Sequence, residues 1–258
     1  MKNNLSSSKI GHYTKKTLAF LNDGDESVSG FIKSLLTILV IVVAIRTFAF
    51  ESFRIPSGSM YPTNYIGDFL FVSKYKYGYS PYSIMFSPKI FEGRIFASEP
   101  ERGEVAVFRF PKDTSVDYIK RVIGMPGDKI QMRGGLLHIN GKAMDLERIE
   151  DFMIEDKGHM RKVEQYVETL PNGVKHKILK HETFGMGRAD NTAELIVPAG
   201  HYFMMGDNRD RSMDSRYIND VGFIPFENFI GRAEVVYMSI DWSWPWSLRL
   251  DRCFTRIR

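Results

Sequence analysis

Apolar and polar positions divide the chain into a short apolar segment near its start and a long region of alternating pattern. Residues 31–50 read FIKSLLTILVIVVAIRTFAF, and Thr37 alone interrupts the central run LLTILVIVVAI. A helix that is apolar on all sides crosses a membrane or lies buried in protein. The segment reaches spanning length only with Lys33 and Arg46 near its ends, where their charges can extend to the interfaces. We therefore predict a transmembrane anchor over 31–50.

Two other interpretations of this segment stay open. One is a buried helix of a soluble protein, although such uniform aliphatic character leaves no polar face to meet water. The other is a cleaved secretory signal, although no small-x-small cleavage site follows. Several lysines precede the segment, whereas Arg54 is the one basic residue soon after it. The positive-inside rule therefore predicts a cytoplasmic polar tail over 1–30, with the C-terminal region across the membrane.

From residue 51 onward the pattern is typical of strands. VAVFRF (105–110) and DYIKRVIG (117–124) alternate or run apolar at strand length, with Pro and Gly between them. Asn140-Gly141 is the strongest short hairpin signal, and it stands between two apolar stretches. HYFMM and EVVYMSI predict further strands. No long helical period follows the apolar segment.

The segment 144–194 is more charged and less apolar than its flanks, which predicts an inserted subdomain. We therefore expect a mainly β fold, in which an antiparallel β domain over 51–143 and 195–258 carries an inserted β subdomain. One N-terminal transmembrane helix precedes this domain.

Composition narrows the class of protein without fixing its function. The 258 residues suffice for one large or two small domains beyond any tail. A hydrophobic share of 43% and a charged share of 26% exclude collagen, coiled coil and disorder of the whole chain. A net charge of +4 is too slight to indicate a nucleic-acid partner. The single cysteine, Cys253, excludes a disulfide within the chain and a multi-cysteine metal site.

Candidate chemistry begins directly after the apolar segment, at RIPSGSMYPT. Ser57 and Ser59 stand between two prolines, where no regular helix forms and a hydroxyl can stay free of a hydrogen-bonded ladder. A polar turn leaving a membrane would have the same composition. A serine nucleophile also needs a base. His201 lies near Asp207 in sequence, so a Ser–His–Asp triad stays open.

A lysine can serve as the base if it is uncharged. Its ordinary pKa is about 10.4, so burial has to lower the pKa by about three units, which costs about 4 kcal/mol. Lys120 meets this requirement for burial in part, because Tyr118 and Val122 share its face of a strand while Arg121 points to the opposite face. A lysine on a strand is more often a solvated edge residue. This signal is weak by itself.

Five sequence boxes, taken together and in this order, resemble the bacterial type I signal peptidases, a family of Ser–Lys serine peptidases also called leader peptidases. The boxes are RIPSGSMYPT, IGDFLFVSKYKYG, RGEVAVFRFPKD, DYIKRVIGMPGD and GHYFMMGDNRDRSMDSRY. IRTFAFESF and the C-terminal WPWSLRLDR extend the resemblance. The N-terminal tail and the segment 144–194 lie outside it. The domain over 51–143 and 195–258 would then be the catalytic one.

The resemblance implies a role for individual residues. Ser59 matches the nucleophile and Lys120 the general base, and the Ser57 hydroxyl would join the Ser59 N–H in the oxyanion hole. Ser212 matches the serine that orients the lysine. The matched structural residues near the site are Asp207, Arg209, Asp214 and Arg216. The matched substrate-binding residues are Phe53, Ile55, Met60, Tyr118 and Ile119.

The implied reaction removes N-terminal signal peptides from exported preproteins after small residues of the Ala-x-Ala type, through an acyl-enzyme. No metal, cofactor or nucleic acid is implied. The implied partners are signal peptides and the lipid bilayer. The implied location is the bacterial inner membrane, with one pass and the catalytic domain on the periplasmic side. Asn64 and Tyr65 stand where members often carry apolar residues, which predicts a different rim of a substrate pocket.

Three alternatives to a signal peptidase differ from it in the class of protein or in the substrate. Self-cleaving repressors of the LexA type also use Ser and Lys on a related β fold, but they carry a DNA-binding domain and no apolar anchor. A dedicated pilin- or conjugation-type processing peptidase would share every catalytic motif and differ only in substrate. A membrane-anchored β protein without enzymatic activity would be expected to have lost Ser59 or Lys120, and both are present.

Overall fold

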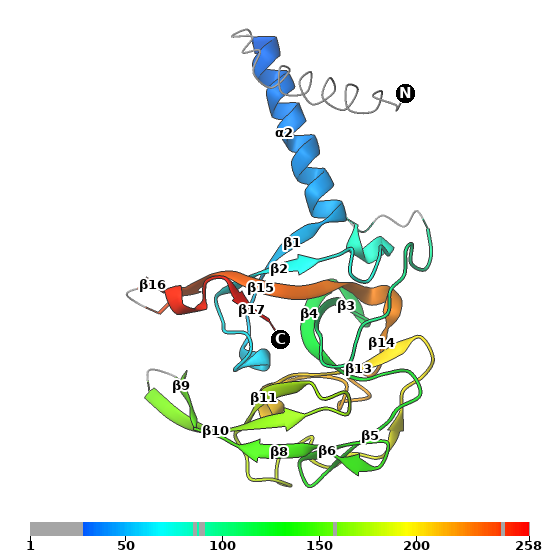
Figure 1. The fold of residues 1–258 in the computed structure, drawn as a ribbon, viewed down its shortest axis with the longest axis vertical. Helices are drawn as coiled ribbons and strands as arrows, with labels where there is room; N and C mark the ends of the chain where they lie inside the picture. Colours follow the sequence, from blue (N-terminus) through cyan, green and yellow to red (C-terminus); the bar gives the residue numbers. More distant parts are fainter. Residues whose placement is uncertain (1–27, 85–86, 88–90, 157–158, 244–245, 258) are drawn as a thin grey trace, which may run out of the picture. The chain divides into compact units, whose positions relative to one another are not determined.

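Antiparallel strands make up most of the regular structure that follows one N-terminal helix (Figure 1). The computed structural model describes residues 28–84, 87, 91–156, 159–243 and 246–257. For these residues, the prediction of a mainly β fold preceded by one apolar helix is confirmed. Most of the predicted polar tail lies outside them.

The helix α2 spans Val28–Phe48 and is 21 residues long. At 1.5 Å per residue it measures about 31 Å, close to the hydrocarbon thickness of a bilayer. Its length and composition are those of a membrane-crossing segment. It starts at Val28, earlier than the predicted 31–50, and it ends at Phe48 because Phe50 already pairs with Ser73 at the start of β1.

The largest sheet has the strand order β1-β2-β15-β3-β4-β13-β14, with β16 and β17 also paired to β15. β15 lies in its middle and pairs with β2 and with β3 (Figure 1). All these pairings are antiparallel. The strands are β1 Phe50–Arg54, β2 Asp68–Ser73, β3 Val105–Phe110, β4 Asp113–Gly124, β13 His201–Met205, β14 Ile224–Pro225, β15 Phe229–Asp241, β16 Ser247–Leu248 and β17 Thr255–Arg256.

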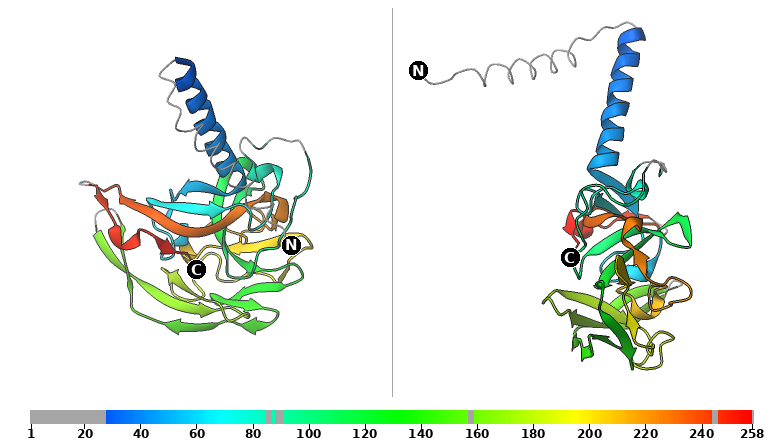
Figure 2. Two further views of the ribbon diagram at one scale, coloured as in Figure 1. Left: turned by 45° about the horizontal axis from the view of Figure 1, so that its top comes forward. Right: turned by 90° about the vertical axis from the view of Figure 1, so that its right-hand side faces the viewer.

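Two smaller sheets are built from the chain between β4 and β13. One has the order β12-β5-β6-β7, and the other has the order β11-β10-β8 with β9 also paired to β10. Their strands are β5 Lys129–Arg133, β6 Leu136–Ile139, β7 Lys142–Ala143, β8 Asp145–Arg148, β9 Phe152–Asp156, β10 His159–Thr169, β11 Lys175–Lys180 and β12 Leu195–Ile196. The β8–β11 sheet falls within the segment 144–194, called the insert below. Within the unit Thr47–Arg258, the insert sheet lies at the end opposite β1 and β2 (Figure 2).

Several strand predictions hold in detail. VAVFRF is β3, and Asn140-Gly141 turns the chain from β6 to β7 with positive φ angles of 54° and 80°. Such angles at both turn residues are those of the tight type I′ hairpin. β4 begins at Asp113, earlier than predicted, because exposed residues continue the hairpin with β3 without any apolar signal.

The hydrophobic core fixes the backbone that follows β1. Ile55 and Met60 are 2% and 0% exposed, and they pack with Leu70 and Val105 in one cluster. Ser59 is only half-buried, although it directly precedes Met60. Burial of Met60 therefore anchors this turn and leaves the Ser59 side chain on its other side.

Short 3-10 turns complete the described structure. They are η1 Gly58–Met60, η2 Pro81–Ser83, η3 Arg209–Arg211, η4 Phe226–Asn228 and η5 Leu250–Arg252.

Candidate active site

Ser59 and Lys120 lie side by side, although 61 positions separate them in the sequence. Lys120 Nζ is 2.8 Å from Ser59 Oγ. It also donates a hydrogen bond of 2.8 Å to the Ile119 carbonyl oxygen. Ser59 belongs to η1 and Lys120 to β4, where the small Ala106 of β3 is its cross-strand partner. The contact thus joins the Ser59 hydroxyl of η1 to the Lys120 amine of β4.

Burial changes the protonation equilibrium of Lys120, which is 4% exposed. Burial lowers the pKa of Lys120 from 10.5 to about 8, with Asp214 and Asp207 acting in the opposite direction. At that pKa, about a tenth of the molecules carry a neutral lysine at pH 7. A neutral amine within hydrogen-bond distance of a hydroxyl can accept its proton.

The backbone of η1 leaves donors free next to Ser59. The first N–H groups of a helical turn have no acceptor within the turn. In the part of the chain that the structure describes, neither the Ser59 N–H nor the Ser57 hydroxyl has a partner. Ser57 is extended, at φ −133° and ψ 156°, so it stands just before the turn. Two hydrogen-bond donors are therefore available beside the Ser59 hydroxyl.

The loop after β13 packs closely against η1. The Asn208 N–H donates to the Ser59 carbonyl oxygen at 3.1 Å, and Asn208 Nδ2 donates to the Gly58 carbonyl oxygen at 2.9 Å. Gly206 makes this approach possible, since a Cβ there would collide with Ser212 Oγ and lie 2.6 Å from the Ser59 carbonyl oxygen. Any side chain at Gly206 would separate the two loops.

Buried ion pairs hold this loop and the neighbouring strand. Arg216 contacts both carboxylate oxygens of Asp214 at 2.8 Å, and Arg121 contacts both oxygens of Asp207 at 2.8 and 2.6 Å. Thr63 donates a further hydrogen bond of 2.5 Å to Asp207. Burial alone would raise the pKa of each carboxyl, but the paired arginine holds both pKa values below the ordinary range. Within the described ranges, no group of three or more His, Cys, Asp or Glu residues is placed to hold a metal ion.

The histidine alternative is not supported by contacts among the described residues. His201 Nδ1 lies 2.9 Å from the Ala199 carbonyl oxygen, and Asp207 is already paired with Arg121. The structure thus brings Lys120, and not His201, to Ser59.

Ser212 lies beside Gly206 in the loop after β13. Its hydroxyl is buried, and it helps to lower the pKa of the Asp214 carboxyl. The predicted contact between Ser212 and Lys120 stays a prediction.

A comparison with protein families identifies a family whose match includes both Ser59 and Lys120. The family model described as "Signal peptidase, peptidase S26" matches residues 28–238, which include both Ser59 and Lys120. The chain belongs to the signal peptidase family, peptidase S26. Its resemblance to signal peptidases, inferred from the sequence boxes, is thereby confirmed.

Individual relatives of this S26 peptidase share most of its length. Signal peptidase I of Rickettsia typhi is 42% identical over 247 residues, which cover 87% of this chain and 92% of that protein. Signal peptidase I of Rickettsia canadensis is 42% identical over 248 residues, with the same coverage. A crystal structure of a signal peptidase I from Enterococcus faecalis is 27% identical, with a TM-score of 0.31, and covers 52% of this chain and 97% of that one.

The residues expected to line the substrate cleft of this S26 peptidase differ in exposure. Phe53, Tyr118 and Ile119 are half-buried, so parts of their side chains face solvent. Ile55 and Met60 are buried in the hydrophobic cluster below η1, which carries the candidate nucleophile Ser59 and is called the nucleophile turn below. In this conformation Met60 is 0% exposed and is not itself accessible to a substrate.

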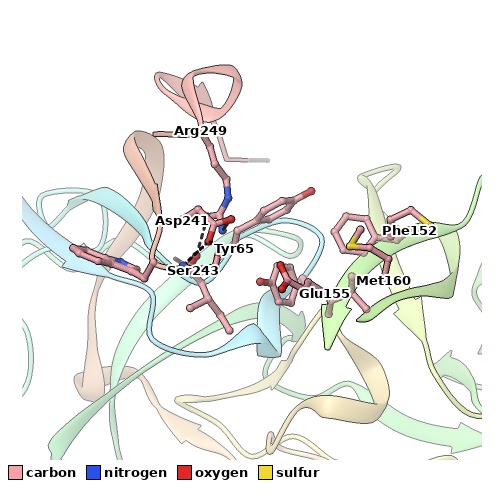
Figure 3. A pocket seen from close by; sticks show the side chains of 12 residues that line it. Tyr65, Phe152, Glu155, Met160, Asp241, Ser243 and Arg249 are labelled. Carbon is pink, nitrogen blue, oxygen red and sulfur yellow. Dashed lines mark hydrogen bonds and ion pairs between the residues drawn. The ribbon is translucent and has the colours of Figure 1, made fainter. Parts of the chain in front are cut away.

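A cavity of about 390 Å³ opens beside the segment that follows η1 (Figure 3). Tyr61, Tyr65 and Phe152 form an aromatic wall, with ring centres 5.1 to 5.9 Å apart. Arg249 and Asp241, paired at 2.9 Å, border the cavity as well. Phe152 belongs to β9, so the insert reaches the segment directly after Ser59.

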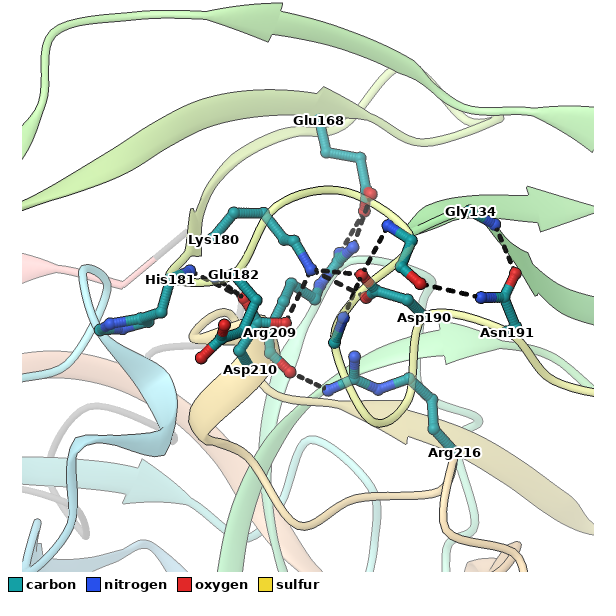
Figure 4. Close-up of polar contacts among 12 residues, drawn as sticks. Gly134, Glu168, Lys180, His181, Glu182, Asp190, Asn191, Arg209, Asp210 and Arg216 are labelled. Carbon is teal, nitrogen blue, oxygen red and sulfur yellow. Dashed lines mark hydrogen bonds and ion pairs between the residues drawn. The ribbon is translucent and has the colours of Figure 1, made fainter.

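The insert also holds the loop after β13 through buried charges (Figure 4). Lys180 Nζ lies between Asp190 and Asp210, at 2.8 and 2.7 Å, and its side chain is 1% exposed. Glu168 accepts two hydrogen bonds from Arg209, at 2.8 and 2.5 Å. Arg209 therefore pairs with the insert, whereas the Asp207 two positions earlier pairs with β4.

His181 completes this connection. Its Nε2 is 2.9 Å from Asn208 Oδ1. Asn208 Nδ2 donates to Gly58, so the amide oxygen is free to accept, and His181 is the donor. The insert is thus linked through Asn208 to the backbone of the nucleophile turn.

Sequence analysis did not single out Arg121, Asn208, Glu168 or Lys180. Arg121 could have been found, since a cation on the buried face of a predicted strand requires a carboxylate partner. Asn208 lies within a matched box. Glu168 and Lys180 carry no local signal, because Arg209 lies 41 positions from Glu168, and Asp190 and Asp210 lie 10 and 30 positions from Lys180.

Proposed function

We propose that this chain cleaves N-terminal signal peptides from exported preproteins, with Ser59 as nucleophile and Lys120 as general base. The observation that carries the proposal is the 2.8 Å distance between Lys120 Nζ and Ser59 Oγ. The pKa of Lys120, lowered by burial to about 8, supports the role of base. Membership of the S26 family and relatives named signal peptidase I support the substrate class.

Each chemical step has a named atom in this proposal. Neutral Lys120 takes the Ser59 hydroxyl proton as Oγ attacks the carbonyl carbon of the scissile bond. The Ser59 N–H and the Ser57 hydroxyl donate hydrogen bonds to the carbonyl oxygen as it becomes negative. The C–N bond breaks as Lys120 returns the proton to the leaving amine. Lys120 then activates a water molecule, which hydrolyses the ester and restores the Ser59 hydroxyl.

Other residues support this chemistry from outside the reacting atoms. We assign Asp207, Arg209, Asp214 and Arg216 to the scaffold, because each is buried in an ion pair. Ser212 would orient the lysine. Apolar walls that include Phe53 and Ile119 suit small substrate residues such as Ala before the cut. Tyr118 is a further cleft position in the proposal, and the buried Ile55 and Met60 would support the cleft from beneath.

Cleavage of a preprotein with an Ala-x-Ala site tests the assignment. The full-length chain in detergent is compared with Ser59→Ala, Lys120→Ala and His201→Ala, and the new N-termini are sequenced. Ser59→Ala and Lys120→Ala should each lower kcat by at least about a thousandfold, whereas His201→Ala should keep wild-type activity. An active Lys120→Ala with an inactive His201→Ala would overturn the choice of base.

We further propose that α2 anchors the chain in the bacterial inner membrane, with its N-terminus in the cytoplasm and the β domain on the periplasmic side. The length and composition of α2 suit a single pass. The lysines before the helix support this orientation. Substrate signal peptides are themselves membrane-embedded, so an anchor raises their encounter with the site.

A further inference from the structure

A second cavity borders the nucleophile turn. Its volume is about 230 Å³, and its lining includes Gly58, directly before Ser59. Asn208, which donates to the Ser59 carbonyl oxygen, also lines it. No residue expected to bind substrate before the cut borders this cavity. A substrate chain that enters over β1 and β4 and passes Ser59 would leave the site here.

This cavity adjoins others along the insert. It shares Tyr61 and Ile154 with the aromatic cavity of about 390 Å³. It shares Arg161 and His181 with a third cavity, of about 400 Å³, between β10 and the end of β11. The surface next to Ser59 is therefore hollowed along β9 and the start of β10. Such a surface can accommodate several residues of an extended chain.

The lining combines an apolar wall with charged groups. Tyr61, Ile66 and Ile154 form the apolar part. Glu155, Arg161 and Arg211 are its charged residues.

Arg211 lies three residues after Asn208, which contacts the nucleophile turn. It lies at the end of η3, is exposed, and forms no salt bridge within the described residues. Its neighbour His181 adds no charge near neutral pH, because burial and the Arg211 charge lower the pKa of that imidazole. A carboxylate in this cavity would therefore meet the Arg211 guanidinium.

We propose that this cavity binds the first residues of the mature part of the preprotein, and that Arg211 favours an acidic side chain there. The inference rests on the proposed function, because the scissile bond at Ser59 defines which part of the substrate leaves on this side. Contacts with Tyr61 and Ile154 hold the chain, and the Arg211 charge sets the preference among side chains.

A substrate series tests this preference. The preproteins share one Ala-x-Ala segment and carry Asp, Asn or Lys at the second and third mature positions. The wild-type chain should cleave the Asp substrate with kcat/KM about fivefold above the Lys substrate, the range of an exposed charge pair. Arg211→Gln should abolish this ratio and Arg211→Glu should invert it. High salt should reduce it in the wild type.

Controls separate the preference from the chemistry. Arg133→Glu changes an exposed arginine on β5 that borders none of these cavities, and it should keep the wild-type ratio. The Asn substrate should be cleaved equally by all Arg211 variants, which shows that they are folded and active. Loss of cleavage in Ser59→Ala tests the proposed function independently. A wild-type Asp-to-Lys ratio in Arg211→Glu would overturn the assignment of Arg211.

A binding measurement tests the location itself. A photo-crosslinking residue is placed at the second mature position of a preprotein bound to the Ser59→Ala chain. The products should map to β9 or η3 by mass spectrometry. Products that map only to β1 or β4 would place the mature segment elsewhere and overturn the proposal.

Discussion

Lys120 has two carboxylates in its neighbourhood, and neither is available to it. Asp214 is paired with Arg216 and Asp207 with Arg121, all four buried. Burial therefore dominates, and the pKa of Lys120 is lowered to about 8. A free carboxylate at the same place would instead favour the charged amine. The paired arginines thus offset the carboxylate charges that would stabilise the charged form of Lys120.

The rate of cleavage should follow the neutral fraction of Lys120. Because the protonated lysine cannot act as a base, kcat/KM should rise about tenfold per pH unit below pH 8 and level off above it. The measurement is kcat/KM of the full-length chain between pH 6 and 10. His201→Ala should leave the profile unchanged. A profile that levels off near pH 6.5 would point to a histidine instead.

Among elements, η3 and the loop around it are held from two sides. Asn208 holds the nucleophile turn on one side, and the insert strands β10 and β11 contribute Glu168 and Lys180 on the other. These insert contacts are buried, whereas the pair between Lys129 and Glu194 is half-exposed at 3.6 Å. The chain thus offers a buried and an exposed lysine pair for comparison.

Removal of the buried lysine should destabilise the chain strongly. Lys180→Met leaves Asp190 and Asp210 buried without a cation, which should lower the free energy of unfolding by about 3–5 kcal/mol. Lys129→Met should change it by less than about 1 kcal/mol, because water already screens that pair. Thermal unfolding of the full-length chain followed by circular dichroism compares the two. Equal effects would contradict a structural role of Lys180.

Within the whole molecule, α2 and the β domain belong to different compact units of the chain. The helix has the length to cross a bilayer, and basic residues are concentrated before it. The proposed topology follows from these two properties of the chain alone.

Protease protection tests the orientation. In sealed vesicles whose cytoplasmic face is outward, added protease should remove only the N-terminal tail and leave the β domain intact. Lysis of the vesicles with detergent should then expose the β domain to the same protease. Digestion of the β domain before lysis would contradict the proposed topology.

Local patterns in the sequence predicted the parts of the fold that local forces determine. Alternation predicted β3, and the Asn140-Gly141 pair predicted the β6–β7 turn, because each signal lies within a few residues. The apolar run predicted a helix, but the helix ends earlier than predicted because pairing of Phe50 with Ser73 begins the first strand. That pairing is a tertiary contact that no local pattern contains.

The sequence likewise predicted the part of the site that lies in local motifs and missed the contacts that depend on the fold. Motif spacing indicated Ser59 and Lys120, and the structure places them at hydrogen-bond distance. Asn64 was noted as a departure at a pocket rim, yet it is fully buried and both amide atoms lack a partner among the described residues. The contact between Glu168 and Arg209 required the fold of the insert, because no pattern relates positions 41 residues apart.

The position of β13 beside β4 has a consequence for engineering. The chain leaves the sheet after Gly124 and returns at His201, and Phe203 pairs with Gly124. The whole excursion therefore behaves as the loop of a very long hairpin, whose closure entropy grows only slowly with length. Homologous segments could be exchanged there as cassettes without a change in strand register. A transplanted cassette would need to bring its own acid for Arg209 and its own cation for Asp210.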